Sequence, residues 1–281
     1  MIMKQFDMTR FGRVVKLDFA EGRKALMWGA LCMLLLYLFF FWFAHNIGMS
    51  ESHFDYTQRM MNLNDAQLKE YRIKEICNAV AAFGVIAMFI YFLIAASTLY
   101  RGEQKKQQRI AWLMLPANNL EKFASRWVYL LAFSVVGGVL PFFVADGIHM
   151  VYLWMDSYPM MASTDDFFRV FPHVAEPYGP RLRDVVAMYL MLVAIHSFYL
   201  FGGVFFKKFH FIAASAVLAI SFSVFVGLLN AIYSNDTSAN SGESALWIMM
   251  IVSACCIALF TWLAYRLFCR WQVVTNKFAN I

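Results

Sequence analysis

The stretch that decides the fold runs from Leu26 to Ile47 and reads LMWGALCMLLLYLFFFWFAHNI. It contains no Lys, Arg, Asp or Glu, and it has the roughly 20 residues that an α-helix needs to cross about 30 Å of hydrocarbon. It is too long for the apolar part of a secretory signal, and no cleavage site of small residues follows it. We therefore expect a retained membrane span.

The rest of the chain repeats this pattern. Five further apolar stretches follow, so the predicted spans are about 26–47, 77–99, 127–151, 185–206, 209–233 and 245–268. Of the 281 residues, 61% are hydrophobic and 15% are charged, whereas soluble domains have about 45–50% and about 25%. The composition excludes a water-soluble globular protein and a disordered chain. The sequence predicts an all-α, polytopic membrane protein with six transmembrane helices, divided into a cytoplasmic amphipathic segment, 1–25, and a transmembrane domain, 26–281.

The basic residues predict the orientation of these spans. If the N-terminus is cytoplasmic, 17 of the 24 Lys and Arg residues fall on the cytoplasmic side, which is where positive charge concentrates in membrane proteins. An even number of spans then leaves both termini in the cytoplasm. We expect a multi-pass protein of the bacterial cytoplasmic (inner) membrane, in contact with the lipid bilayer. In a membrane protein the distribution of basic residues matters more than the net charge of +6, so no nucleic acid partner is expected.

Residues 3–24 predict a short amphipathic helix that lies on the inner membrane face before the first span. Its apolar residues share one side of the helix, and most of its basic residues lie away from that side. The apolar set is Phe11, Val14, Val15 and Phe19, and the basic set is Arg10, Arg13, Arg23 and Lys24. Asp18 sits among the apolar residues, so the amphipathic pattern is imperfect.

The first cytoplasmic loop, 100–126, reads YRGEQKKQQRIAWLMLPANNLEKFASR. It predicts a basic helix that ends at Pro116, because the residue before a proline disfavours the helical conformation. Asn118 and Glu121 then have the spacing of a capping box, which starts a second helix that continues into the third span. The apolar run 110–115 needs a cover, which can be the bilayer surface, the rest of the protein or a partner.

Strongly polar residues inside spans are energetically expensive and are therefore candidates for function. The candidates are His196, Asn230, Asp146 and His149. His196 can make a helix–helix hydrogen bond or line a substrate path. Asp146 and His149 share a helix face and could bind a metal together with His173, but a position at the water boundary explains them more simply, so no metal site is predicted.

Motifs for common enzyme chemistry do not occur in the sequence. There is no GxxxxGK[ST] phosphate-binding loop, no HExxH zinc motif and no GxSxG nucleophile motif. We therefore predict no catalytic residues and no cofactor in this chain, and we do not expect it to be an enzyme.

With its six spans, its N-terminal amphipathic segment and its helical first loop, the chain resembles the permease subunits of ABC-type exporters, most closely uncharacterised permeases common in Bacteroidetes. In these proteins the loop has a Lys/Arg-rich stretch, a Leu-Pro-Ala turn, and then Glu-Lys and a following Arg. The matching positions are Lys105, Lys106 and Arg109, then Leu115, Pro116 and Ala117, then Glu121, Lys122 and Arg126.

The resemblance implies that a coupling helix around Gln104–Leu115 docks into a separate ATP-binding subunit through the loop 104–122. It also implies that the N-terminal segment lies on that subunit, and that a second permease chain, identical or paralogous, pairs with this one. ATP hydrolysis would occur in the partner. The partner-coupling residues would be Arg109, Trp112, Leu113, Leu115, Pro116, Glu121, Lys122 and Arg126, with the apolar ones filling a cleft and the last three holding the geometry of the loop.

Two alternatives from other functional classes remain open. The chain could be an integral-membrane scaffold that anchors a cytosolic partner without transporting a substrate. It could also be an intramembrane enzyme that acts on lipid and uses Asp146, His149 or His196.

Overall fold

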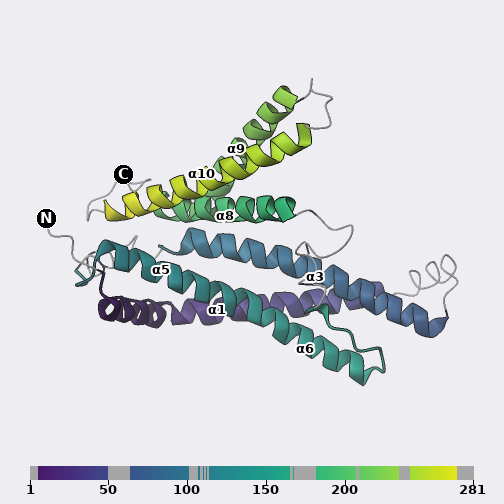
Figure 1. Cartoon of the computed structure of the whole chain (residues 1–281). Coiled ribbons are helices and arrows are strands. Elements are labelled where there is room, and N and C mark those ends of the chain that lie inside the picture. Colours follow the sequence, from purple (N-terminus) through teal and green to yellow (C-terminus); the bar gives the residue numbers. More distant parts are fainter. Residues whose placement is uncertain are drawn as a thin grey trace. The chain divides into compact units, whose positions relative to one another are not determined.

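The computed structural model describes residues 6–49, 64–100, 107, 110, 112, 114–164, 167, 182–206, 209–233 and 241–270. Within the last two ranges, the side chains at 222, 225, 226, 228–233 and 241–245 lie outside the description as well. All the secondary-structure elements named for these described residues are helices (Figure 1). The helices are α1 (Met8–Gly48), α3 (Asp65–Thr98), α5 (Asn119–Ser134), α6 (Leu140–Met155), α8 (Leu182–Phe205), α9 (His210–Tyr233) and α10 (Ser241–Cys269).

Five helical stretches among the described residues are long and apolar enough to cross a membrane. They are Met8–Gly48, Asp65–Thr98, Asn119–Met155, Leu182–Phe205 and Leu246–Cys269. The prediction of an all-helical, multi-pass architecture agrees with these stretches. Helix α9 coincides with the predicted fifth span, but the apolar stretch recorded there is the shorter His210–Ser221. A sixth span therefore stays a prediction.

Helix α1 runs without interruption from Met8 to Gly48. The sequence between these residues contains no proline, and so no backbone N–H is missing from the helical ladder. The short separate helix that was expected before the first span is therefore not seen. The N-terminal segment is instead the first part of one 41-residue helix.

A π-helical turn, η2 (Val135–Val139), joins α5 to α6. Pro141 is the second residue after this turn and cannot donate a backbone hydrogen bond. Such wide turns are a recognised cause of helix kinks. A proline inside a helix predicts a mild kink, and the structure places the irregular turn just before Pro141. The hydroxyl of Tyr37 donates to the carbonyl oxygen of Gly138 within the turn at 3.2 Å.

The chain divides into two compact units. The first comprises residues 1–19, 92–130 and 173–281, and the second comprises residues 20–91 and 131–172. Helices α1, α3 and the α5–α6 helix each contribute to both units.

In the first unit, α8 packs against α9 and α10 (Figure 1). The hydroxyl groups of Tyr199 on α8 and Ser215 on α9 are hydrogen-bonded at 2.6 Å. The two helices on either side of residues 206–209 are therefore neighbours. At Gly203, a Cβ atom would lie 2.5 Å from the carbonyl oxygen of Ser97, so glycine is what allows α8 to approach the end of α3 this closely.

Candidate functional site

The start of α5 is organised by Glu121, which is completely buried. Its Oε2 accepts a hydrogen bond from the backbone N–H of Asn118 at 2.9 Å. Asn118 precedes the first residue of α5, and Glu121 is the third residue of that helix. The carboxylate arm of the predicted capping box is therefore confirmed.

The other oxygen of Glu121 reaches the start of a different helix. Oε1 accepts the backbone N–H of Asp7 at 2.9 Å and a guanidinium N–H of Arg10 at 3.2 Å. Asp7 precedes the first residue of α1. A single carboxylate thus serves the first turns of α1 and α5 together, although these helices begin more than a hundred residues apart in the sequence.

Asp7 completes the cap of α1 with its own side chain. Its Oδ1 accepts the backbone N–H groups of Thr9 at 2.8 Å and Arg10 at 3.4 Å. These are the donors that a helix leaves unpaired at its N-terminus. The hydrogen bond from Thr9 is the main cause that holds the pKa of the Asp7 carboxyl below its usual value. Arg10 also pairs with Asp7 at 3.4 Å, so the three side chains form one network, which we call the double cap (Asp7, Arg10 and Glu121).

A second link lies further along the same two helices. The guanidinium of Arg126 on α5 lies 3.4 Å from a carboxylate oxygen of Asp18 on α1, and both side chains are buried. The ring of Phe19 packs edge-on against that of Tyr129, with 5.5 Å between their centroids. Asp18 interrupted the apolar pattern in the sequence, and this ion pair explains why.

Trp112, from the segment before Pro116, is buried against α5 and is only 4% exposed. The guanidinium of Arg126 lies over its indole ring at 4.3 Å, and the ammonium of Lys122 donates to its backbone carbonyl at 3.0 Å. The rest of the protein therefore covers Trp112. The expectation that this side chain fills a cleft on a partner does not fit its burial, and Trp112 acts instead as an internal anchor for the loop.

Other apolar residues of the loop remain accessible. Met114 is 78% exposed and Leu120 is 51% exposed. Ile110 and Pro116 are exposed as well, and Leu115 is half-buried. Two further predicted coupling residues, Arg109 and Leu113, lie outside the described residues.

The predicted polar candidates are divided between the two units. Asp146 and His149 belong to the second unit, whereas the double cap belongs to the first. Asp146 is completely buried, and its carboxylate accepts the backbone N–H groups of Ser163 and Thr164, both at 2.9 Å, and the hydroxyl of Thr164 at 2.6 Å. These three bonds give Asp146 a structural role, because they tie residues 163–164 to α6. The third residue of the metal hypothesis, His173, lies outside the described residues.

His149 is 4% exposed and stacks on Phe41 with 4.6 Å between ring centroids. The ring of His45 lies 6.1 Å away. Neither ring nitrogen of His149 has a hydrogen-bond partner among the described residues. His149 and His45 thus form a pair of histidines surrounded by aromatic rings within the second unit.

The last two candidates lie in the first unit. His196 is half-buried on α8, and its ring lies 6.1 Å from that of Trp127. Asn230 falls within helix α9, but its side chain is outside the described residues.

Sequence reasoning identified Glu121, Lys122 and Arg126 but missed their partners. Asp7, Arg10 and Asp18 contact them only through the tertiary structure. The one available signal was Asp18, a carboxylate on an otherwise apolar helix side. Comparison with known proteins adds no further assignment, since the chain matches no protein-family model, no curated protein and no solved structure.

Proposed function

We propose that this chain is the membrane-spanning permease subunit of an ABC-type exporter, and that a separate ATP-binding subunit drives it through the loop 104–122. The double cap is the observation that carries this proposal. It joins the first turns of two apolar helices at the place where the loop enters α5. A force on the loop would therefore reach α1 and α5 together.

The contacts between α1 and the start of α5 are strong enough to make this connection rigid. Hydrogen bonds that involve a charged group contribute about 1.5–3 kcal/mol each, and breaking a buried ion pair by removing one partner costs about 3–5 kcal/mol. The double cap and the Arg126–Asp18 pair supply several such contacts between α1 and the start of α5. Movement of packed helices as rigid bodies is a common way in which a local push becomes a larger change.

The side chains that would contact the partner are Met114 and Leu120. Both are large, strongly exposed apolar residues near the turn at Pro116, and such exposed apolar residues indicate a surface that something else covers. Trp112, Lys122 and Arg126 would fix the loop from inside rather than touch the partner, because all three are buried.

A second permease chain, identical or paralogous, would complete the transporter. Helix α10 exposes large apolar side chains along much of its length, including Trp247, Ile251 and Leu259. Lipid or another permease chain would cover them. The topology that goes with this proposal has both termini in the cytoplasm of a bacterium and a sixth span formed by α9.

A scaffold that anchors a cytosolic protein would use the same loop, so the loop geometry supports it equally. The two functions differ in one measurable property. In a transporter, a transported substrate stimulates ATP hydrolysis by the assembled complex, whereas a scaffold has no substrate that does so.

The proposal is tested by affinity purification of the tagged chain from membranes of its host in mild detergent, followed by mass spectrometry. We expect a near-stoichiometric protein that contains a GxxxxGK[ST] phosphate-binding loop. The double variant Met114→Asp, Leu120→Asp should reduce its recovery by about tenfold or more, as loss of an interface hot spot does. Met155→Asp is the matched control, because Met155 is 72% exposed at the far end of the α5–α6 helix. A preparation without an ATP-binding protein, or one that the double variant leaves unchanged, would contradict the proposal.

A further inference from the structure

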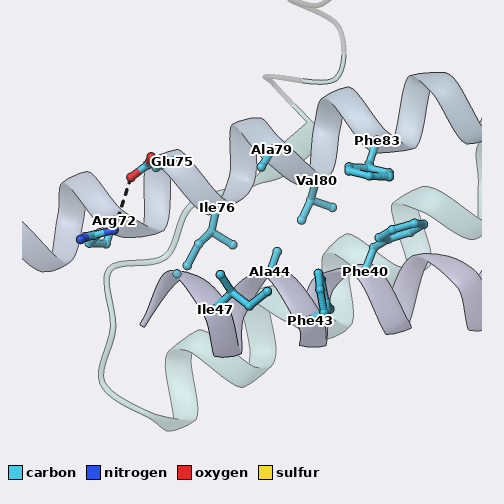
Figure 2. A pocket seen from close by; sticks show the side chains of 11 residues that line it. Phe40, Phe43, Ala44, Ile47, Arg72, Glu75, Ile76, Ala79, Val80 and Phe83 are labelled. Atoms are coloured by element: carbon cyan, nitrogen blue, oxygen red, sulfur yellow. Dashed lines mark ion pairs between the residues drawn. The ribbon is translucent and has the colours of Figure 1, made fainter. Parts of the chain in front are cut away.

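A groove lies between the end of α1 and the first half of α3, entirely within the second unit (Figure 2). Its volume is about 240 Å³. Its apolar lining comes from both helices and includes Phe40, Phe43 and Ile47 of α1 and Ile76 and Phe83 of α3. Two charged residues also line it, Arg72 and Glu75.

The polar and apolar parts of the groove are separated along its length. In Figure 2, Arg72 and Glu75 lie at one end, and Phe40 and Phe83 lie at the other. Arg72 and Glu75 form an ion pair at 3.7 Å, which is longer than a hydrogen bond. The Arg72 side chain is 1% exposed, whereas that of Glu75 is 55% exposed.

The charged end lies near the predicted edge of the membrane. Helix α1 ends at Gly48, and the predicted second span begins at residue 77. From residue 77, where the second span is predicted to begin, to Phe83 the groove follows α3 for six residues, which at about 1.5 Å per residue is about 9 Å. This length is about a third of the roughly 30 Å of hydrocarbon in a bilayer. On the predicted span, the groove therefore reaches from the headgroup region about a third of the way across the membrane.

The groove is narrow, and it is open to the surroundings of the helices. Its volume is below the roughly 300–1,000 Å³ of pockets that hold drug-sized ligands. Phe43, Ile47 and Phe83 on its walls are each about half exposed. A flexible hydrocarbon chain can enter such a groove sideways from the bilayer, and the separate charged end requires a headgroup rather than a second chain.

We infer that this groove binds one phospholipid of the bilayer that carries a phosphate and a primary ammonium group, such as phosphatidylethanolamine. One acyl chain lies between α1 and α3. The phosphate lies at the Arg72 end of the groove, in the electric field of the buried guanidinium, and the ammonium lies near the exposed carboxylate of Glu75. The lipid's two charges complement the ion pair, whereas an anionic headgroup would leave Glu75 facing a like charge.

Native mass spectrometry of the full-length protein tests this inference. The protein is purified from vesicles that contain equal amounts of phosphatidylethanolamine, phosphatidylglycerol and phosphatidylcholine with identical acyl chains, and it is then stripped of loosely bound lipid by added detergent. We expect one phosphatidylethanolamine molecule to remain bound. Ala79→Phe, which places a ring in the groove, should lower its occupancy at least tenfold. Ala82→Phe is the matched control, because Ala82 is exposed on the same helix but does not line the groove.

A separate variant tests the proposed headgroup contacts. Glu75→Gln should abolish the preference for phosphatidylethanolamine over phosphatidylcholine, whose quaternary ammonium has no N–H to donate, while leaving one lipid bound. Equal retention of lipid by Ala79→Phe and the native protein would overturn the groove as a binding site. Preferential retention of phosphatidylglycerol, or no preference among the three lipids, would overturn the proposed headgroup contacts.

Discussion

Replacing Glu121 by glutamine tests whether one carboxylate holds the starts of two helices. The native side chain accepts two backbone N–H groups, one on each oxygen and both at 2.9 Å, and it also pairs with Arg10. Glutamine has nearly the same shape but only one acceptor oxygen, so it can serve one of the two helices and turns an NH₂ group toward the other. A buried donor that loses its acceptor costs about 1–3 kcal/mol, and the lost charge weakens the remaining bonds.

We therefore expect the free energy of local opening at one of the two helix starts to fall by about 2 kcal/mol, which corresponds to about 25- to 30-fold faster amide exchange. Hydrogen exchange with mass spectrometry on detergent-solubilised protein measures this in the peptides that contain Asp7 and Asn118. Glu21→Gln makes the same chemical change at an exposed position of α1 and should leave both peptides unaffected. If Glu121→Gln changes exchange by less than about threefold in both peptides, the shared cap is not a stabilising contact.

Three further changes test separate parts of the structure. Arg126→Met leaves Asp18 charged and buried, and so should destabilise the solubilised protein by about 3–5 kcal/mol. Adding Asp18→Asn should recover part of the lost thermal midpoint, and a double variant with no recovery would contradict the ion pair. Gly203→Ala places a Cβ atom 2.5 Å from a backbone carbonyl oxygen of α3, so it should cost about 1–3 kcal/mol, whereas Gly147→Ala meets nothing within 4 Å and should not lower the thermal midpoint. The pKa of Asp7 is lowered chiefly by the hydrogen bond from the backbone N–H of Thr9, so the cap is complete above the usual carboxyl pKa and is lost as the pH falls through the lowered value. Amide exchange of the N-terminal peptide, corrected for its intrinsic pH dependence, should therefore rise as the pH falls over that range in the native protein. Asp7→Asn should show no such rise.

Local sequence patterns predicted much of the fold. Long stretches without charge can be compared directly with the thickness of a bilayer, and five helical stretches among the described residues are long and apolar enough to cross one. The cap at Glu121 was predictable because both members of a capping box lie within four residues. An irregularity in the helix near Pro141 was predictable, since the missing N–H of a proline is a property of that residue alone.

The contacts between distant segments were not predictable in this way. No rule of spacing links Asp7 to Glu121 or Asp18 to Arg126, because these pairs depend on how α1 packs against α5. The position of Trp112 shows the same limit. Its neighbours in the sequence suggested an exposed apolar run, but Lys122 and Arg126 from the next helix bind and cover it.

The central claim is that the loop before α5 contacts an ATP-binding subunit, and site-specific photocrosslinking at Met114 tests it most directly. Met114→p-benzoylphenylalanine is expressed in the host and irradiated in intact membranes, and the crosslinked peptide is sequenced by mass spectrometry. We predict an adduct with a protein that contains a GxxxxGK[ST] loop, and no such adduct from the same substitution at Met155. The claim is contradicted if position 114 crosslinks only to lipid or to this chain itself, or if both positions give the same adduct.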